Sequence, residues 1–192
     1  MYTILNNIPD KRVDRTTTSL QFKKDLIDFF EPLKLQNCLE IGTCYGFSTH
    51  VLSYLFQNVV TIDIDLENLH KAMKFNKNNT NITYMLGDST NSDYDVNMQF
   101  DIIFIDANHH YQFVMADIKQ SIKYGVTNAY IVFDDYGLPE TVPAVKIAVD
   151  ECISNGILEF VRYIGEPKGS EPRIGRPLVD WEGVITKINT AV

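Results

Sequence analysis

The sequence predicts an α/β fold, built on a doubly wound, mostly parallel sheet of seven strands with an antiparallel edge pair. Short apolar runs of strand length alternate with segments of helical periodicity, which is typical of a parallel sheet flanked by helices. Glycine or aspartate follows each of the first five runs, where a strand would give way to a turn. Two further strand-like segments follow with no helical segment between them, which predicts the edge pair.

The first five runs predict the parallel strands. Phe100–Ile105 is the most apolar and therefore the best candidate for a central strand. Val59–Ile64 is rich in β-branched residues, which favour strands. The five predicted strands are residues 38–41, 59–64, 82–86, 100–105 and 129–133.

The intervening segments predict five helices, because apolar residues recur at three- and four-residue spacing. Thr18 or Ser19 can cap the first of them. The predicted apolar faces are Phe22, Leu26, Phe29, Phe30 and Leu33; Phe47, Val51, Leu52, Leu55 and Phe56; Leu66, Leu69, Ala72 and Met73; Tyr111, Met115, Ile118 and Ile122; and Val142, Val145, Val149 and Cys152.

The edge pair is predicted at Leu158–Ile164 and Trp181–Ile188. Their connection, Gly165–Asp180, is rich in glycine, proline and charge, which is typical of a long loop. Arg173 and Arg176 in this loop can clamp an anionic group of a ligand, although a solvated loop is the better explanation of them.

Length and composition indicate one globular domain spanning residues 1–192, with 45% hydrophobic and 22% charged residues. The net charge of −8 and the lack of a basic stripe disfavour nucleic acid or an anionic membrane as a partner. No apolar run is long enough to span a membrane. The three scattered cysteines fit neither a disulfide framework nor a zinc site, and no signal peptide is evident, so we expect a cytoplasmic protein.

The turn after the first strand is a candidate cofactor site. Glycine at position 42 permits a tight turn, and glycine at position 46 allows a ligand to approach the backbone. Serine at position 48 and the free N–H groups of the following helix can hold a carboxylate. A plain turn with a glycine near a helix start is the alternative. The candidate residues of this turn are Glu40, Gly42, Thr43, Gly46 and Ser48.

Acidic residues at the next two strand ends extend this candidate site. Asp63 ends the second strand about 20 residues after the turn, where an acidic residue can accept hydrogen bonds from ribose hydroxyls. The alternative is a helix N-cap, a role that Asp65 can also fill. Asp88, after the third strand, can contact an adenine amino group or close a turn.

The pattern Glu-x-Gly-x-x-x-Gly-x-Ser, followed by this acidic strand end and Gly-Asp-Ser, resembles class I S-adenosylmethionine-dependent methyltransferases. It differs from the Gly-x-Gly-x-x-Gly of nicotinamide enzymes. The resemblance covers nearly the whole chain and implies a Rossmann-like sheet whose last strand is inserted antiparallel. It implies that Glu40, Gly42 and Ser48 lie around the methionine end of S-adenosylmethionine, Asp63 at the ribose and Asp88 near the adenine.

Three carboxylates follow the fourth and fifth strands: Asp106, Asp134 and Asp135. Neighbouring parallel strands would bring them together, where their mutual repulsion requires a proton or a bound cation. An oxygen-only set suits Mg²⁺, whereas zinc would usually recruit His or Cys. The alternative is that these residues cap turns and bind no metal.

His109 lies three residues beyond Asp106, at a predicted helix start. An imidazole of near-neutral pKa there can take a proton from an acceptor hydroxyl, so His109 and Asp106 are the catalytic candidates. A solvated histidine is the alternative, and His110 is the weaker competitor. His50 and His70 lie on predicted helices away from strand ends, where structural or surface roles are expected.

This set resembles the metal-dependent O-methyltransferases of the catechol type and, more closely, the macrocin and related sugar or antibiotic type. The resemblance implies that Asp106, Asp134 and Asp135 hold Mg²⁺ and that His109 supplies the base. There are two departures: Asn108 replaces an acid found in some relatives, and the long N-terminal lid of many relatives is not evident. The second makes a contribution from a partner in a homodimer plausible.

We therefore expect Mg²⁺-assisted methylation of a hydroxyl on a small molecule, such as a sugar or vicinal diol. Two alternatives stay open: metal-independent methylation of a small molecule on nitrogen, and a non-catalytic module that binds the cofactor. A nucleic-acid acceptor is disfavoured by the acidic charge balance.

Overall fold

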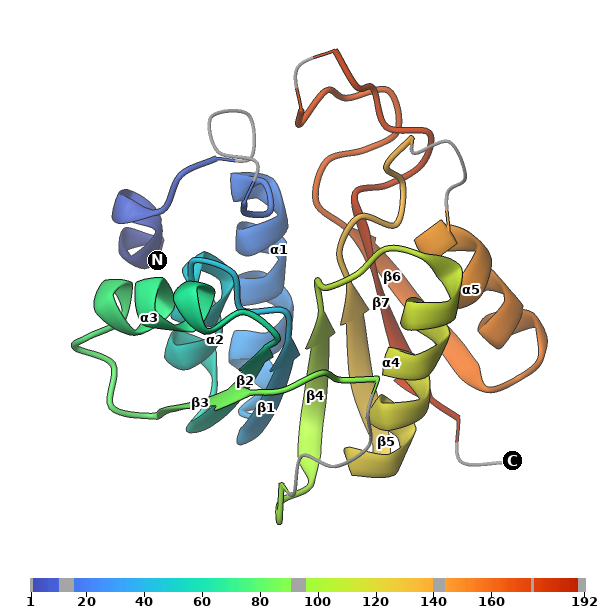
Figure 1. Cartoon of the computed structure of the whole chain (residues 1–192). Coiled ribbons are helices and arrows are strands. Elements are labelled where there is room, and N and C mark those ends of the chain that lie inside the picture. The colour runs from blue at the N-terminus through green and yellow to red at the C-terminus, as the bar shows by residue number, and fades with distance from the viewer. Residues whose placement is uncertain (1, 11–15, 91–95, 140–143, 174, 190–192) are drawn as a thin grey trace.

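One seven-stranded sheet forms the centre of the computed structural model, which describes residues 2–10, 16–90, 96–139, 144–173 and 175–189 (Figure 1). The strand order is β3-β2-β1-β4-β5-β7-β6. The first five strands are parallel, and β7 runs antiparallel to both of its neighbours. The strands are β1 (Asn37–Ile41), β2 (Asn58–Asp63), β3 (Ile82–Leu86), β4 (Phe100–Ile105), β5 (Gly125–Phe133), β6 (Leu158–Ile164) and β7 (Gly183–Ile188).

Helices cover both faces of this sheet, as the sequence predicts. One face carries α1 (Leu20–Phe30) and α2 (Phe47–Leu55), and α3 (Leu66–Phe75) packs beside α2. The other face carries α4 (Tyr111–Tyr124) and α5 (Ala144–Ser154) (Figure 1). Two short 3-10 helices, η1 (Thr3–Asn7) and η2 (Glu31–Leu33), flank α1. No helix within the described ranges is long and apolar enough to cross a bilayer.

Burial of both faces explains the continuous apolar run of β4. Successive side chains of a strand point to opposite faces. Ile102 and Phe104 accordingly join the core beneath α1 and α2, whereas Ile103 and Ile105 join the core beneath α4 and α5. Phe22 of α1 is fully buried and meets Phe104 edge-on, with 6.0 Å between ring centroids. The central strand is therefore placed as predicted.

Two predicted strand starts are wrong by two residues or more, and the predicted starts of β1 and β2 each lie one residue too late. The strand β5 starts at Gly125, four residues before the predicted Ala129. A register shift and the left-handed backbone of Asn128 (φ 62°) interrupt the strand before its apolar run, so the first part of β5 has no apolar pattern that predicts it. The last strand begins at Gly183 and not at Trp181. The backbone of Glu182 is hydrogen-bonded to Tyr136 and to Glu166, so it belongs to the loops above the sheet.

The predicted apolar faces are partly wrong. Five of their residues are exposed at the surface: Leu33, Leu66, Met73, Tyr111 and Ile122. In α4 the buried stripe contains Val114 and Ile118 together with the polar Asp117 and Ser121, so apolar spacing alone locates it incorrectly. Val142 lies outside the described residues. Cys38 and Cys152 are buried.

The start of α1 is tied to the start of β7. Ser19 is the N-cap, since its hydroxyl accepts a hydrogen bond from the backbone N–H of Phe22 (3.0 Å). The same hydroxyl donates to the buried carboxylate of Glu182 (2.5 Å), which also accepts from the Ser19 N–H (2.9 Å) and the Glu166 N–H (3.0 Å). Ser19 rather than Thr18 therefore caps the helix.

Replacing this cap should destabilise the fold. Ser19→Ala is expected to lower the free energy of unfolding by about 1–2 kcal/mol, because it removes a cap and one hydrogen bond to a buried carboxylate. Urea denaturation measures the change. Thr18→Val is the matched control: the Thr18 hydroxyl is buried and has no hydrogen-bond partner among the described residues, so this substitution should cost little. Equal losses in the two variants would contradict the assigned cap.

Candidate active site

A cavity of about 520 Å³ opens at the carboxyl ends of β1, β2, β3 and β4. β1 pairs with both β2 and β4, so the strand order reverses at β1. Ligands of open α/β sheets bind in the crevice at such a switch point. The cavity is large enough for a cofactor-sized ligand. Its lining includes Gly42, Asp63, Asp88, Asp106, Asn108 and Asp117 among polar and small residues, and Ile41, Ile62, Ile64 and Phe113 among apolar ones.

The two glycines of the turn after β1 serve different contacts. Gly42 adopts a left-handed backbone (φ 96°), and a Cβ there would lie 2.1 Å from the carbonyl oxygen of Asp106. Gly42 therefore allows the end of β1 to touch the end of β4. A Cβ on Gly46 would lie 2.7 Å from Ala72 Cβ and from Asn76 Nδ2. Gly46 therefore lets α2 begin against α3, and it is not among the described residues that line the cavity, so its approach to a ligand stays a prediction.

Asp63 holds this turn against the end of β2. Its Oδ2 accepts hydrogen bonds from the backbone N–H groups of Thr43 (3.2 Å) and Cys44 (2.8 Å), and its Oδ1 accepts one from Asp65 (2.8 Å). Asp63 also lines the cavity, so the structure brings it together with the turn, as expected. Asp65 is the N-cap of α3, since its carboxylate accepts a hydrogen bond from the Glu67 N–H. The role of helix N-cap, which was the alternative for Asp63, therefore belongs to Asp65.

Four of the predicted cofactor residues are not among the described residues that line the cavity: Glu40, Thr43, Gly46 and Ser48. Glu40 is fully buried, and its Oε2 accepts from the hydroxyls of Thr49 (2.5 Å) and Thr61 (2.6 Å). Its Oε1 has no hydrogen-bond partner among the described residues. Burial raises the pKa of Glu40 to about 8, against the lowering effect of the two hydroxyls. Glu40 can therefore act on a ligand here only through its neighbours.

The segment after β3 forms the far end of the cavity. Asp88 Oδ1 accepts from both the N–H (2.9 Å) and the hydroxyl (2.7 Å) of Thr90, so Asp88 closes a turn and lines the cavity at once. Sequence reasoning missed Asp117 on α4, which faces the same end. A signal existed, because an acidic residue between Val114 and Ile118 interrupts an otherwise apolar helix face.

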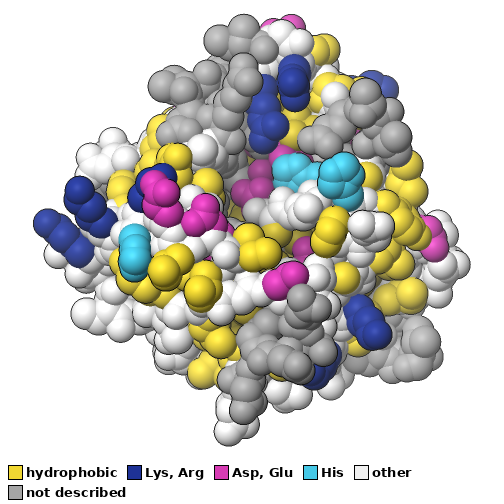
Figure 2. All heavy atoms as spheres, viewed as in Figure 1, with side chains coloured by type: hydrophobic (Ala, Val, Ile, Leu, Met, Phe, Trp, Pro, Cys, Tyr) yellow, Lys and Arg dark blue, Asp and Glu magenta, His cyan; other side chains and the backbone are white. Residues whose placement is uncertain are grey.

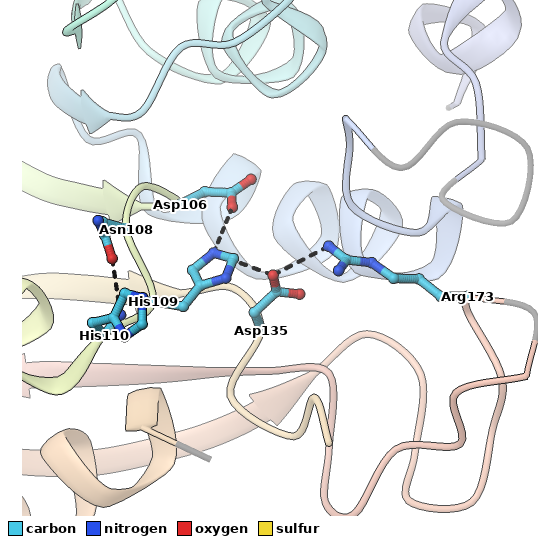
Figure 3. A network of polar contacts seen from close by, with 6 residues as sticks. All are labelled: Asp106, Asn108, His109, His110, Asp135 and Arg173. Carbon is cyan, nitrogen blue, oxygen red and sulfur yellow. Dashed lines mark hydrogen bonds and ion pairs between the residues drawn. The ribbon is translucent and has the colours of Figure 1, made fainter. Parts of the chain in front are cut away.

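Beside the cavity, an aspartate from β4, an aspartate from β5 and a histidine converge (Figure 3). Asp106, His109 and Asp135 each offer a ligand atom within 4.8 Å of the others. His109 Nε2 lies 3.8 Å from Asp106 Oδ1 and 3.2 Å from Asp135 Oδ2. Asp134, which is also described and is buried, lies outside this group. The predicted convergence of strand ends therefore involves Asp106 and Asp135, and the group also includes the histidine.

Two further features shape this group. Asp135 has a left-handed backbone (φ 57°), a conformation that costs energy for any residue except glycine and that is common at functional sites. Arg173, from the connection between β6 and β7, places its Nη2 3.3 Å from Asp135 Oδ2. Basic, acidic and histidine side chains accordingly meet near the middle of the face shown in Figure 2.

The expected near-neutral pKa of His109 is wrong for the protein alone. Burial lowers the pKa of His109, but the hydrogen bond with Asp106 and the charges of Asp135, Asp106 and Asp134 raise it to about 9. His109 is therefore protonated at neutral pH until some of this negative charge is neutralised.

The other histidines have no place in this group. His110 is exposed and precedes α4, and its backbone N–H donates to Asn108 Oδ1 (3.0 Å). Asn108, which lines the cavity, thus also holds the start of α4. His50 Nδ1 is hydrogen-bonded to Asn76 Oδ1 (2.8 Å) on the far side of α2, and His70 is exposed on α3. Structural or surface roles fit both, as expected.

Comparisons with known proteins agree with this architecture. A family model described as a methyltransferase domain matches residues 39–136, which is just over half of the chain and runs from β1 to just beyond β5. The uncharacterized protein R132 of Acanthamoeba polyphaga mimivirus is 34% identical over an alignment of 134 residues, and the match covers 58% of this chain. The chain spans 59% of the length of that relative.

Solved structures share the fold over nearly the whole chain at low sequence identity. A putative O-methyltransferase from Klebsiella pneumoniae has a TM-score of 0.69 and 17% identity, with 99% of this chain and 95% of that chain covered. An O-methyltransferase from Bacillus cereus in complex with S-adenosylhomocysteine has a TM-score of 0.68 and 19% identity, with 98% and 96% covered. The N-methyltransferase NodS from Bradyrhizobium japonicum has a TM-score of 0.67 and 16% identity, with 96% and 90% covered.

These similarities and the strand order with its antiparallel β7 point to one conclusion. The chain belongs to the methyltransferase-domain family, and its fold is that of the class I S-adenosylmethionine-dependent methyltransferases.

Proposed function

We propose that this protein transfers the methyl group of S-adenosylmethionine to a hydroxyl of a small molecule, with the assistance of Mg²⁺. The observation that carries the proposal is the meeting of Asp106, His109 and Asp135 beside a cavity that also contains Asp63. Acceptors with neighbouring hydroxyls, such as sugars and diols, fit a site where a carboxylate pair and a base lie together.

The cavity has the features that the cofactor requires. Asp63 uses two lone pairs of Oδ2 and one of Oδ1 for backbone N–H groups, which fixes its carboxylate and leaves capacity to accept from ribose hydroxyls. The close approach of Gly42 to Asp106 sets the cofactor turn directly beside the carboxylate of β4. The Bacillus cereus and Bradyrhizobium japonicum structures hold S-adenosylhomocysteine, the product of the proposed transfer.

The carboxylates of Asp106 and Asp135, with Asp134 buried next to them, would hold the cation. A set of carboxylate oxygens suits Mg²⁺, which keeps positions open for water and substrate. A divalent cation there supplies Lewis-acid chemistry, since it polarises an oxygen of the acceptor. Neutralisation of the carboxylates also removes the charge that raises the pKa of His109, so that the imidazole can accept the hydroxyl proton.

One observation favours a second candidate, methylation without a metal. His109 and Arg173 already place positive charge against Asp135 Oδ2 from two directions. This arrangement offsets part of the negative charge that otherwise calls for a cation. An amine acceptor, which needs no activation by a metal once it has lost its proton, is the natural substrate class of such a site.

Metal removal tests the two candidates. Release of S-adenosylhomocysteine is measured with panels of sugars, diols, catechols and amines, before and after treatment with a chelator and after Mg²⁺ is restored. We expect turnover of a hydroxyl acceptor to fall at least about tenfold with the chelator and to return with Mg²⁺. Unchanged turnover would support the metal-independent candidate. Tight binding of S-adenosylhomocysteine without transfer to any acceptor would indicate a non-catalytic module.

A further inference from the structure

The connection between β6 and β7 places an arginine against the proposed catalytic group. Arg173 Nη2 lies 3.3 Å from Asp135 Oδ2, on the side of Asp135 opposite His109 (Figure 3). The side chain of Arg173 is only 16% exposed, so a solvated loop does not explain it, whereas Arg176 of the same connection is exposed. The metal-assisted reaction proposed above does not use the Arg173 side chain.

Backbone contacts fix this connection above the end of β5. Leu178 is buried, and the N–H of Val179 donates to the carbonyl oxygen of Gly137 (2.9 Å), two residues after Asp135. These contacts tie the segment that carries Arg173 to the segment that carries Asp135. The guanidinium group therefore has a defined position beside the site.

The hydrogen bonds of this guanidinium group are incomplete. Arg173 Nε is buried and has no partner among the residues that the structure describes. Nε and Nη2 donate from the same edge of the planar group, and such an edge matches two oxygens of a carboxylate or a phosphate. Asp135 meets this edge at Nη2 and not at Nε, and its 3.3 Å contact is longer than a strong charge-assisted hydrogen bond. A buried donor without an acceptor is costly, which points to an oxygen that a ligand brings.

The charge balance of the site also favours a negatively charged ligand. Without a metal, Arg173 and the protonated His109 offset two of the three carboxylate charges contributed by Asp106, Asp134 and Asp135. When Mg²⁺ is bound as proposed, positive charge exceeds negative charge by one while His109 holds the proton of the acceptor. An anionic group on the acceptor restores the balance. The guanidinium group is free to bind it, because the cation then engages the carboxylates.

The order of the groups indicates which ligand brings the anion. Asp106 lines the cofactor cavity, whereas Arg173 is not among the described residues that line it. His109 Nε2 and Arg173 Nη2 contact the same oxygen of Asp135 from opposite sides (Figure 3). They therefore lie within the span of one small molecule, with the proposed base at one end and the guanidinium group at the other. The acceptor is the ligand that must reach the base.

We propose that Arg173 binds an anionic group of the acceptor, a carboxylate or a phosphate, through Nε and Nη2, and so selects anionic hydroxyl compounds as substrates. This inference rests on the proposed transfer of a methyl group to a hydroxyl. A neutral sugar or diol leaves the buried Nε without a partner and is therefore the poorer substrate.

Paired acceptors test the proposal. Turnover with Mg²⁺ is compared for glucuronate and glucose 6-phosphate against glucose, and for 3,4-dihydroxybenzoate against 3,4-dihydroxybenzamide. In a series that is methylated, we expect kcat/KM of an anionic member to be at least about tenfold higher, mainly through a lower KM, since a hydrogen bond between charged groups is gained. The sugar series separates carboxylate from phosphate. Equal or better turnover of the neutral members would overturn the inference and leave the proposed function intact. No transfer to any acceptor would overturn both.

Two matched variants identify the residue responsible. Arg173→Gln is expected to reduce the preference for the anionic member at least about tenfold. Arg176→Gln makes the same change of charge on an exposed side chain of the same connection and should leave that preference within about twofold. An equal effect in the two variants would overturn the assignment. Weaker binding of S-adenosylhomocysteine by Arg173→Gln, with the preference retained, would also overturn it, because Arg173 would then hold the cofactor.

Calorimetry provides a measurement that does not depend on turnover. Glucuronate, glucose 6-phosphate and 3,4-dihydroxybenzoate are titrated into protein that holds S-adenosylhomocysteine and Mg²⁺. We expect at least one of them to bind the native protein and to bind Arg173→Gln at least about tenfold more weakly. Binding of none of the three to the native protein would overturn the inference. If Arg173→Gln does not fold, the paired acceptors on the native protein still decide the proposal.

Discussion

Replacement of His109 by alanine is expected to lower methyl-transfer turnover by about 10²–10⁴-fold, the usual contribution of a general base. His109 Nε2 is the basic atom that lies with both Asp106 and Asp135 beside the cavity, at 3.8 Å and 3.2 Å from their carboxylate oxygens. The substitution removes the proposed proton acceptor and leaves the two carboxylates in place. Rates of S-adenosylhomocysteine release under saturating cofactor measure the effect.

His110→Ala is the matched control for this variant. His110 is the next residue and is exposed, and its hydrogen bonds to the described residues are made by its backbone: its N–H donates to Asn108 Oδ1, and its carbonyl oxygen accepts from the N–H groups of Phe113 and Val114. We expect His110→Ala to keep turnover within about twofold, as surface substitutions usually do. Full activity in His109→Ala, or an equal loss in both variants, would contradict the role of His109 as the base.

The pH profile of turnover should report the same group. If His109 is the base, as proposed, the neutral imidazole is the active form, so turnover should rise as pH rises through the pKa of His109. That pKa is about 9 in the protein alone: burial lowers it, and the hydrogen bond with Asp106 and the carboxylate charges outweigh this effect. Mg²⁺ reduces this negative charge, so its addition should move the rising limb of the profile to lower pH. If Mg²⁺ does not move the rising limb of the profile, the cation does not bind next to the group that titrates, which would contradict the proposed placing of His109 beside the cation.

The largest expected effect on stability comes from Glu40. Its pKa is about 8 in the folded protein, because burial outweighs the hydrogen bonds from Thr49 and Thr61, against an ordinary value of 4.5. The folded protein therefore keeps a proton that the unfolded chain releases as pH rises from 4.5. The stability that Glu40 contributes is present below pH 4.5 and is lost as pH rises through 8. Over this range the loss amounts to as much as about 5 kcal/mol, at 1.36 kcal/mol for each pKa unit.

Glu40→Gln isolates this contribution, because glutamine resembles the protonated carboxyl and cannot ionise. We expect the free energies of unfolding of native protein and variant to be similar near pH 4.5 and to diverge by several kcal/mol at pH 9, where the variant is the more stable. Urea denaturation across this range measures the difference. Glu159→Gln, on the exposed side of β6, makes the same charge change at the surface and should show little divergence. Parallel curves for native protein and Glu40→Gln would refute the ionisation argument.

The sequence is sufficient to predict those parts of the site that depend on strand ends. Asp63, Asp106 and Asp135 each follow a run of buried, β-branched or aromatic residues, and parallel neighbouring strands must place such residues at one edge of the sheet. The bounds of β3, β4 and β6 follow equally well from their apolar runs. Local pattern decides these features, so a single sequence suffices.

Features that depend on contacts between distant elements could not be predicted in this way. Gly46 is required by its contact with Ala72 of α3, which no property of the turn itself reveals. The contact of Arg173 with Asp135 depends on how a long connection folds back over the sheet. The pKa of His109 depends on the summed charges of three carboxylates from two strands. Each requires the three-dimensional arrangement and cannot be obtained from residue spacing.

The position of β7 has a consequence for how the protein acquires its structure. β7 follows β6 in the chain, yet it pairs with β5 on one side and β6 on the other. Among the described residues, β7 is the only strand that links β6 to the rest of the sheet. During synthesis on the ribosome, β6 therefore emerges before the strand with which it pairs. Until β7 is available, the edge of β5 that leads to Asp135 has unpaired backbone groups. We expect the cofactor end of the site, built on β1 to β4, to become ordered first and the catalytic end to be completed last.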